Sequence, residues 1–144
     1  MRLELSSEGR YAIRALVYLA RFGERVNADT IATEAQIPRR LLARILARLS
    51  HAGLVESHAG RGGGSTLAKL PEDITLRDAV EAAEGPFKVT KCIMEDRNCG
   101  EGRPCALHDA WEEGQSVILE YLGSQTLDDF VAETAAETLP LKES

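Results

Sequence analysis

All three cysteines of the chain and one of its three histidines fall within 17 consecutive positions. The four residues are Cys92, Cys99, Cys105 and His108, and charged residues and glycines surround them in place of an apolar stripe. Cysteines that only fill space in a core would be expected on such a stripe. Because thiolate sulfur and imidazole nitrogen bind transition metals, the segment predicts a metal centre.

Spacing alone leaves four interpretations of this segment open: an iron-sulfur cluster, a structural zinc, a thiol switch, and cysteines without a role. Zinc sites are commonly built on Cys-x-x-Cys pairs, whereas six, five and two residues separate the four candidate ligands here. His108 shares one side with Cys105 if a helix begins there. Three thiolates and one imidazole favour an iron-sulfur cluster. Since these ligands bind only when deprotonated, occupancy would depend on pH and oxidant, as in a sensor.

Positive charge is concentrated in the first half of the chain, although all 144 residues together have a net charge of −6. Residues 1–70 carry 11 Lys and Arg against 6 Asp and Glu, whereas residues 71–144 carry 6 against 17. The two parts therefore have net charges of +5 and −11. A basic half beside an acidic half is typical of a protein that binds a polyanion on one side.

Composition and motifs exclude several other classes. With 44% hydrophobic residues the chain can bury a core, and no apolar run approaches the roughly 20 residues of a membrane span. The first residues lack the apolar segment of a signal peptide, and three cysteines cannot all pair, so the cytoplasm is the expected location. The sequence has no phosphate loop and no Ser-His dyad, so we expect no enzyme activity and no small-molecule substrate.

Periodicity predicts a mainly α fold with a small β-hairpin. Apolar spacing predicts helices over residues 7–23, 27–36 and 38–53, a hairpin over 54–68, and helices that begin near Thr75, Cys105 and Thr126. Two short helices in tandem followed by a hairpin are typical of a winged helix-turn-helix. We therefore expect a DNA-binding domain over residues 1–86, and a ligand loop with a long helix over residues 87–144.

The third predicted helix has the features of a recognition helix. Arg40, Arg44 and Arg48 are four residues apart and share one face, while Arg39 lies at the N-terminal end, where such helices meet base edges. A solvated surface face is the plain alternative, but residues 36–53 contain no acid to balance the arginines. The hairpin turn adds one arginine, and His51 and His58 are expected at the surface or on phosphates. The candidate DNA-binding residues are Arg39, Arg40, Arg44, Arg48, Arg61 and Gly62.

Taken in order, these features resemble a family of bacterial winged-helix transcriptional regulators. That family includes the iron-sulfur cluster regulator IscR, the nitric-oxide sensor NsrR and the cysteine-metabolism regulator CymR. The resemblance runs through residues 7–12, 31–32, 37–38, 53–55, 62–64, 74–76 and 84–86, then the cysteine segment and Trp111. It implies a homodimer that binds a double-stranded DNA operator, and repression is the expected direction of regulation. The expected dimer contacts on the long helix are Trp111, Ile118 and Leu122.

The resemblance also implies a cofactor. Cys92, Cys99, Cys105 and His108 match members that hold a 2Fe-2S cluster and sense iron-sulfur, redox or nitric-oxide status. The first cysteine gap is one residue longer than is common, which leaves 4Fe-4S possible, with Glu8 of a partner subunit as the fourth ligand. Arg61 stands where many relatives have proline, so the operator sequence is not implied. The alternatives are a zinc-containing winged-helix regulator, and a redox protein or scaffold whose first half binds protein.

Overall fold

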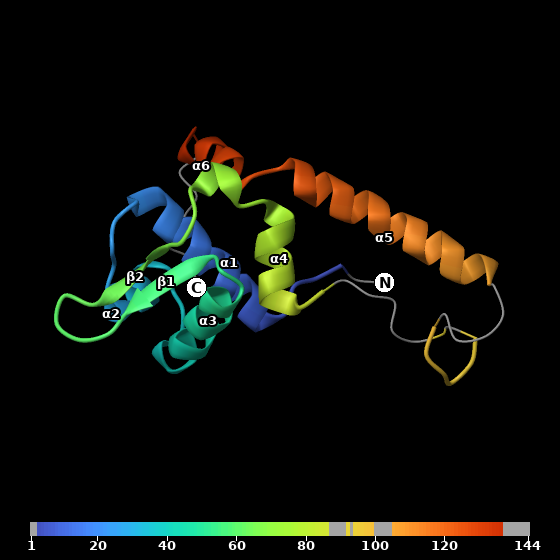
Figure 1. Cartoon of the computed structure of the whole chain (residues 1–144), viewed down its shortest axis with the longest axis horizontal. Coiled ribbons are helices and arrows are strands. Elements are labelled where there is room, and N and C mark those ends of the chain that lie inside the picture. Colours follow the sequence, from blue (N-terminus) through green and yellow to red (C-terminus); the bar gives the residue numbers. More distant parts are fainter. Residues whose placement is uncertain (1–2, 87–91, 93, 100–104, 137–144) are drawn as a thin grey trace.

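The computed structural model describes residues 3–86, 92, 94–99 and 105–136. Within these residues the fold is mainly helical with one antiparallel hairpin, as the sequence predicts (Figure 1). The elements in chain order are α1 (Ser7–Phe22), α2 (Ala28–Glu34), α3 (Arg39–His51), β1 (Val55–His58), β2 (Gly64–Leu67), the 3-10 turn η1 (Pro71–Asp73), α4 (Leu76–Glu84), α5 (Ala106–Ser124) and α6 (Leu127–Ala136).

Side-chain caps fix the starts of three helices. The Asn27 carboxamide oxygen accepts a hydrogen bond from the Thr30 backbone N–H at 2.8 Å and so begins α2. A reciprocal capping box between Thr75 and Asp78, with both bonds at 3.0 Å, begins α4. Asp129 makes the same exchange with Thr126 at the start of α6, and the hydrogen bonds from Thr126 lower the pKa of this carboxyl.

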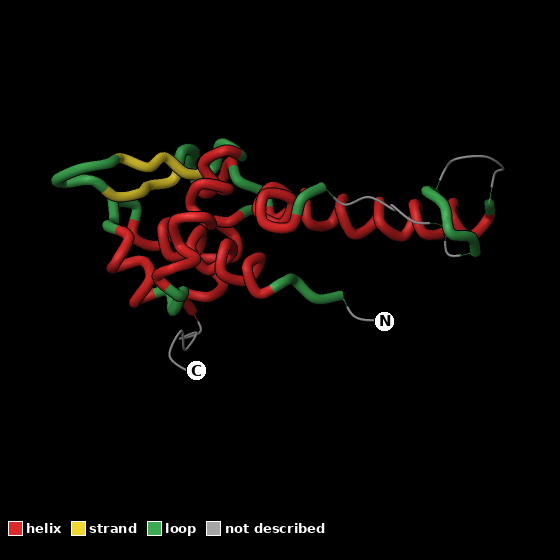
Figure 2. The backbone as a smooth tube through the Cα atoms, turned by 90° about the horizontal axis from the view of Figure 1, so that it is seen from below, coloured by secondary structure: helices red, strands yellow, loops and turns green. Residues whose placement is uncertain are grey.

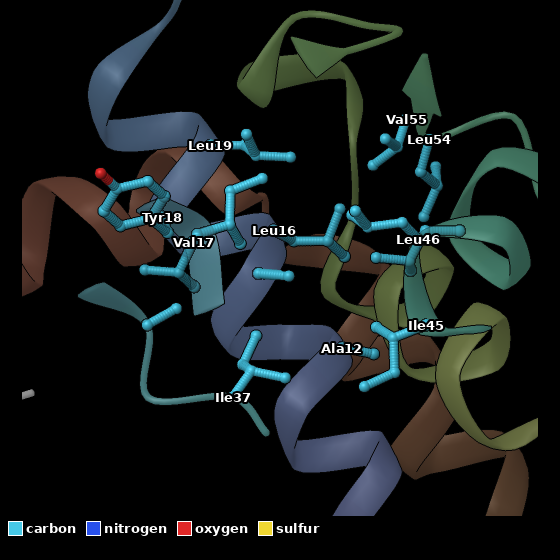
Figure 3. Packing of buried hydrophobic residues seen from close by; sticks show 14 of the residues in the cluster. Ala12, Leu16, Val17, Tyr18, Leu19, Ile37, Ile45, Leu46, Leu54 and Val55 are labelled. Carbon is cyan, nitrogen blue, oxygen red and sulfur yellow. The ribbon is translucent and has the colours of Figure 1, made fainter. Parts of the chain in front are cut away.

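The core lies between α1, the helix-turn-helix and the base of the hairpin (Figure 3). Leu16 of α1 is fully buried among residues of the other elements, including Ile45 of α3 and Val55 of β1. Alternation of three and four residues along α1 and α3 places these apolar side chains on one face of each helix. The buried face of α3 fixes the rotation of this helix, and therefore which of its polar residues face outward.

The hairpin is held close to the segment that precedes α2. Val55 pairs with Leu67 and His58 with Gly64, and Val26 extends the ladder by exchanging two backbone hydrogen bonds with Ser65 at 3.0 and 2.8 Å. A Cβ at Gly64 would lie 2.5 Å from the Val26 carbonyl oxygen, so no larger residue fits there. The glycine run therefore has a packing role at the base of the wing, apart from any contact with DNA.

Helix α6 packs against the first part of the chain. Leu127 is fully buried in the same core as Leu16, and Phe130 and Val131 pack against that core. Thr75 and Thr126 form an antiparallel bridge that joins the segments leading into α4 and α6. The expected division at residue 86 stays a prediction, but the core of the first 86 residues includes side chains from far beyond that position.

Helix α5 leaves this body as an arm. The wing and the N-terminal end of α5 project on opposite sides of the body (Figure 1), and Figure 2 shows the same separation from a second direction. None of the 19 residues of α5 is buried. In the described part of the chain no helix is both long enough and apolar enough to cross a membrane.

Candidate functional site

A groove of about 820 Å³ runs between α3 and the wing. One wall is a face of α3, and the other is formed by the hairpin together with the start of α2. The side chains on the α3 wall follow one another at three or four residues, as a single helix face requires. The lining residues are Asn27, Ala28, Asp29, Arg39, Ala43, Leu46, Ala47, Ser50, His51, Ser57, His58, Gly60, Gly63, Gly64 and Ser65.

Arg39 lies in this groove, where the sequence places the N-terminal end of a recognition helix. Its Nε donates to the Asp29 carboxylate at 2.7 Å, and both side chains are more than half exposed. An exposed ion pair of this kind contributes little to stability, so Arg39 can exchange its partner for a phosphate or a base. The ion pair with Asp29 thus keeps the Arg39 guanidinium in the groove and orients it there.

Arg44 and Arg48 face a different neighbour. Both pair with the carboxylate of Glu8 at the start of α1, and the Arg48 contact is 3.5 Å long. Arg48 also donates to the Ala83 carbonyl oxygen near the end of α4 at 2.8 Å. Sequence spacing correctly groups these two arginines on one side of α3, but that side lies toward α1 and α4. Arg40 is exposed and makes no hydrogen bond or ion pair with the described residues.

Arg61 is exposed in the turn of the wing, beside Gly62. The Gly62 carbonyl oxygen accepts a hydrogen bond from Arg25 at 3.3 Å. Arg25 therefore supports the turn from the loop before α2, a role that the sequence gives no sign of. The bond spans 37 positions of the chain, so only the folded structure can reveal it.

Several groove residues are missing from the arginine-based prediction. Ala43 and Ala47 are small, so α3 can approach a duplex closely there, and Ser50 adds a hydroxyl on the same wall. His51 and His58 line the groove from α3 and β1, which agrees with their expected place at the surface. The sequence could have indicated this wall, because Arg39, Ala43 and Ala47 are four residues apart and share one helix face. A search for charged residues finds only Arg39 on that face.

The four candidate metal ligands line one small cavity at the outer end of α5. Cys92, Cys99, Cys105 and His108 share this cavity of about 10 Å³ with apolar neighbours that include Trp111. The Cys99 sulfur lies 2.7 Å from His108 Nδ1. All three cysteines are free thiols and half-buried. The structure therefore brings together the complete ligand set that the sequence predicts.

The chemical types of the four candidate ligands and the distances between them can be compared with what a zinc ion and an iron-sulfur cluster require. In a tetrahedral zinc site with Zn–S bonds of about 2.3 Å, the ligand atoms lie about 3.8 Å apart. Among the described residues, one group of three possible ligand atoms lies within 4.8 Å of one another, and these atoms belong to His108, Asp109 and Glu112. In this part of the chain, no group of this kind contains His108 and a cysteine sulfur. Three thiolate sulfurs with one imidazole suit an iron-sulfur cluster, as the sequence predicts. Because the cavity is small, the loop has to widen to admit one.

The loop is closed by contacts of its own. The Cys92 backbone N–H donates to the Arg97 carbonyl oxygen at 3.0 Å, and the Arg97 guanidinium bonds the Glu95 carboxylate at 2.5 Å. The bond with Glu95 raises the pKa of Arg97, and the nearby thiols of Cys92 and Cys99 act in the same direction.

The predicted dimer contacts lie along α5. Trp111 is 39% exposed although it also borders the cysteine cavity, and Ile118 and Leu122 are half-buried. Tyr121 is 68% exposed on the same helix. The arm thus combines exposed aromatic surface with the metal-ligand cavity. The outer end of α5 lies far from α3 and the hairpin of its own chain (Figure 1).

The similarity to known proteins covers both the groove and the segment with the cysteines. A family model described as Rrf2, iron-dependent transcriptional regulator, matches residues 5–133. The HTH-type transcriptional regulator NsrR of Bacillus subtilis is 33% identical over 146 residues, covering 98% of this chain and 100% of the relative. The solved structure of CymR, the global cysteine regulator of B. subtilis, matches with a TM-score of 0.73 at 27% identity, covering 92% of this chain and 99% of that one. T. potens IscR matches with a TM-score of 0.73 at 28% identity, covering 99% and 94% respectively.

Proposed function

The chain belongs to the Rrf2 family of iron-dependent transcriptional regulators, and on this premise we propose that it is a homodimeric repressor whose operator affinity is set by an iron-sulfur cluster. Family membership confirms the resemblance found in the sequence, the winged-helix fold, and the expectation of a DNA-binding regulator in place of an enzyme. What we propose beyond this is that the protein is a homodimer, that it binds an operator, that it holds a cluster and that it represses.

The groove between α3 and the wing supports the proposed operator contact. A helix with a basic N-terminal end beside a hairpin of backbone and small side chains is shaped to enter a major groove while the wing follows the phosphates. Arg39 supplies charge at the base-reading end, and Arg61 supplies charge at the wing. A guanidinium in either place can bind phosphate or a guanine edge through two parallel bonds.

The single observation that carries the cluster is the common cavity of Cys92, Cys99, Cys105 and His108. We assign these four side chains as its ligands. Three thiolates with one imidazole favour a 2Fe-2S cluster over one zinc ion. A 4Fe-4S cluster that takes Glu8 of a partner subunit is the second candidate, and in that case Glu8 would have to leave Arg44 and Arg48. When bound, the cluster would supply a redox and nitric-oxide-reactive group.

Exposed apolar surface on α5 supports the homodimer. A helix in water is stabilised mainly by packing of its apolar face, yet no residue of α5 is buried in the single chain. Trp111, Val117 and Tyr121 are all largely exposed along it. Pairing with α5 of a second copy would bury this surface, and the half-buried Ile118 and Leu122 are the other expected contacts.

Arg48 supplies a physical link from the cysteine loop to DNA. Its guanidinium binds the Ala83 carbonyl oxygen, two residues before Gly85, where α4 ends and the segment leading to Cys92 begins. Glu8 binds the same guanidinium from α1. A change in the loop that shifts the end of α4 would therefore shift α3 as well. Operator affinity would then depend on the difference in free energy between the two conformations of the protein.

A binding experiment with both forms of the protein tests this function. A duplex selected from a randomised pool is titrated with anaerobic, cluster-loaded protein and with metal-free protein, and Cys99→Ala serves as the variant that cannot load. We expect Kd values that differ by at least about tenfold between the forms, and affinity that falls steeply with salt. Equal Kd values in both forms would contradict cluster sensing, and no binding at low salt would contradict the DNA-binding role.

A further inference from the structure

We propose that Glu112 is a positioning residue for His108, and that it holds the imidazole so that Nδ1, and not Nε2, is the ligand atom. The inference rests on the proposed cluster function and adds a residue outside the ligand set. It concerns the side of the histidine that faces away from the cysteines.

Both ring nitrogens of His108 have a neighbour. Nδ1 lies 2.7 Å from the Cys99 sulfur, inside the cavity, while Nε2 lies 3.8 Å from the Glu112 carboxylate. The histidine side chain is 24% exposed, and the carboxylate of Glu112 reaches it from the solvent side, where it is 68% exposed. The Cys99 sulfur therefore lies on the Nδ1 side of the imidazole, and the Glu112 carboxylate lies on the Nε2 side, where a small movement would bring it within hydrogen-bond distance.

Helix geometry makes this arrangement possible. His108 and Glu112 are four residues apart on α5, so their side chains lie one above the other on the same face. Asp109 adds a second carboxylate, because its oxygen lies within 4.8 Å of the donor atoms of both residues. Asp109 lies in the first turn of α5 and Glu112 in the next turn, so the helix places both carboxylates beside His108.

The chemistry follows from the state of the neutral ring. An imidazole that binds a metal through one nitrogen carries its proton on the other, and a carboxylate near that N–H fixes the tautomer and raises the basicity of the ligand nitrogen. A more basic ligand donates more electron density, which favours the oxidised cluster. It also slows loss of the ligand. Removal of partners of this kind commonly costs about 10-fold to 100-fold in metal affinity.

Glu112→Gln and Glu112→Ala test the inference, with Glu113→Gln as the matched control. Glu113 is the next residue on α5, is exposed, and carries the same charge without a contact to His108. The measurements are the rate of cluster release to an iron chelator and the midpoint potential of the cluster. We expect release about tenfold faster and a more positive potential in both Glu112 variants, with the Glu113 variant unchanged.

Two results would overturn the inference in distinguishable ways. If the wild-type chain loads a cluster, and the Glu112 variants match Glu113→Gln in rate and potential, Glu112 has no positioning role and the proposed function stands. If the wild-type chain loads no cluster under anaerobic reconstitution, the proposed function and this inference fail together. Circular dichroism and sedimentation of each variant show whether the helix and the oligomer are intact.

Discussion

The carboxylate of Glu8, on the first turn of α1, forms an ion pair with the guanidinium of Arg44 in the middle of α3. The same carboxylate reaches Arg48 one turn later. Two of the four α3 arginines predicted to bind DNA thus share this one acid of their own chain, and a third, Arg39, pairs with Asp29. Since Arg44 remains 59% exposed, the pair is partly screened by water and can be exchanged for a phosphate.

Replacement of Glu8 by Gln should release these two arginines. We expect a change in unfolding free energy of only about 0.5 kcal/mol, as for other exposed ion pairs. Nonspecific DNA affinity should rise, with a slope against salt that is steeper by about one charge. Fluorescence anisotropy over a salt series measures the slope. Glu4→Gln removes the same charge from the same segment, and an equal effect from that control would contradict a specific role of Glu8.

Arg39→Ala tests the groove. Arg39 lies at the N-terminal end of α3, which we propose reads the bases. Its loss should therefore weaken binding to the selected operator by about 1–3 kcal/mol and should reduce the salt slope by about one. Arg77→Ala on α4 removes an arginine that lines no part of the groove and pairs with Glu81. Operator affinity that falls equally in both variants would place the DNA elsewhere.

Ile118→Asp tests the arm. A carboxylate in the proposed dimer contact would be buried without a partner, so the variant should be monomeric at concentrations at which the wild-type chain is a dimer. Sedimentation equilibrium gives the mass, and circular dichroism checks that the helices persist. Ser116→Asp places the same charge at an exposed position of α5. A dimer that survives Ile118→Asp would contradict the proposed interface.

Leu127→Ala tests whether α6 belongs to the DNA-binding fold. Leu127 is fully buried in the core, so its truncation should lower the unfolding free energy by about 2–5 kcal/mol. Urea unfolding measures the loss, and Glu133→Ala provides an exposed control on the same helix. A change of less than about 0.5 kcal/mol for Leu127→Ala would indicate that residues 1–86 fold without α6.

Local features of the fold were predictable from the sequence. The Asn27 cap and the Thr75 and Asp78 capping box depend on residues three positions apart, and the apolar stripes depend on helical periodicity, so each can be read within one element. The four candidate metal ligands could also be identified this way, because their types are rare and they lie within one segment, and they line one cavity.

Contacts between distant segments were not predictable in this way. Arg44 meets Glu8 across 36 positions, and Ser6 bonds the Glu84 carboxylate across 78. The sequence places Arg44 on a face of α3, but the packing of α1 and α4 decides what covers that face. For the same reason Leu127 falls in the second expected region, residues 87–144, although it is buried in the core of the first.

The iron, sulfide and zinc content of anaerobically purified protein, with its visible spectrum, tests the central claim most directly. The account predicts equal amounts of iron and sulfide with charge-transfer absorption, and loss of both in Cys99→Ala while the chain stays folded. A colourless protein with one zinc ion per chain would contradict it, because the cysteine cavity would then be a structural site.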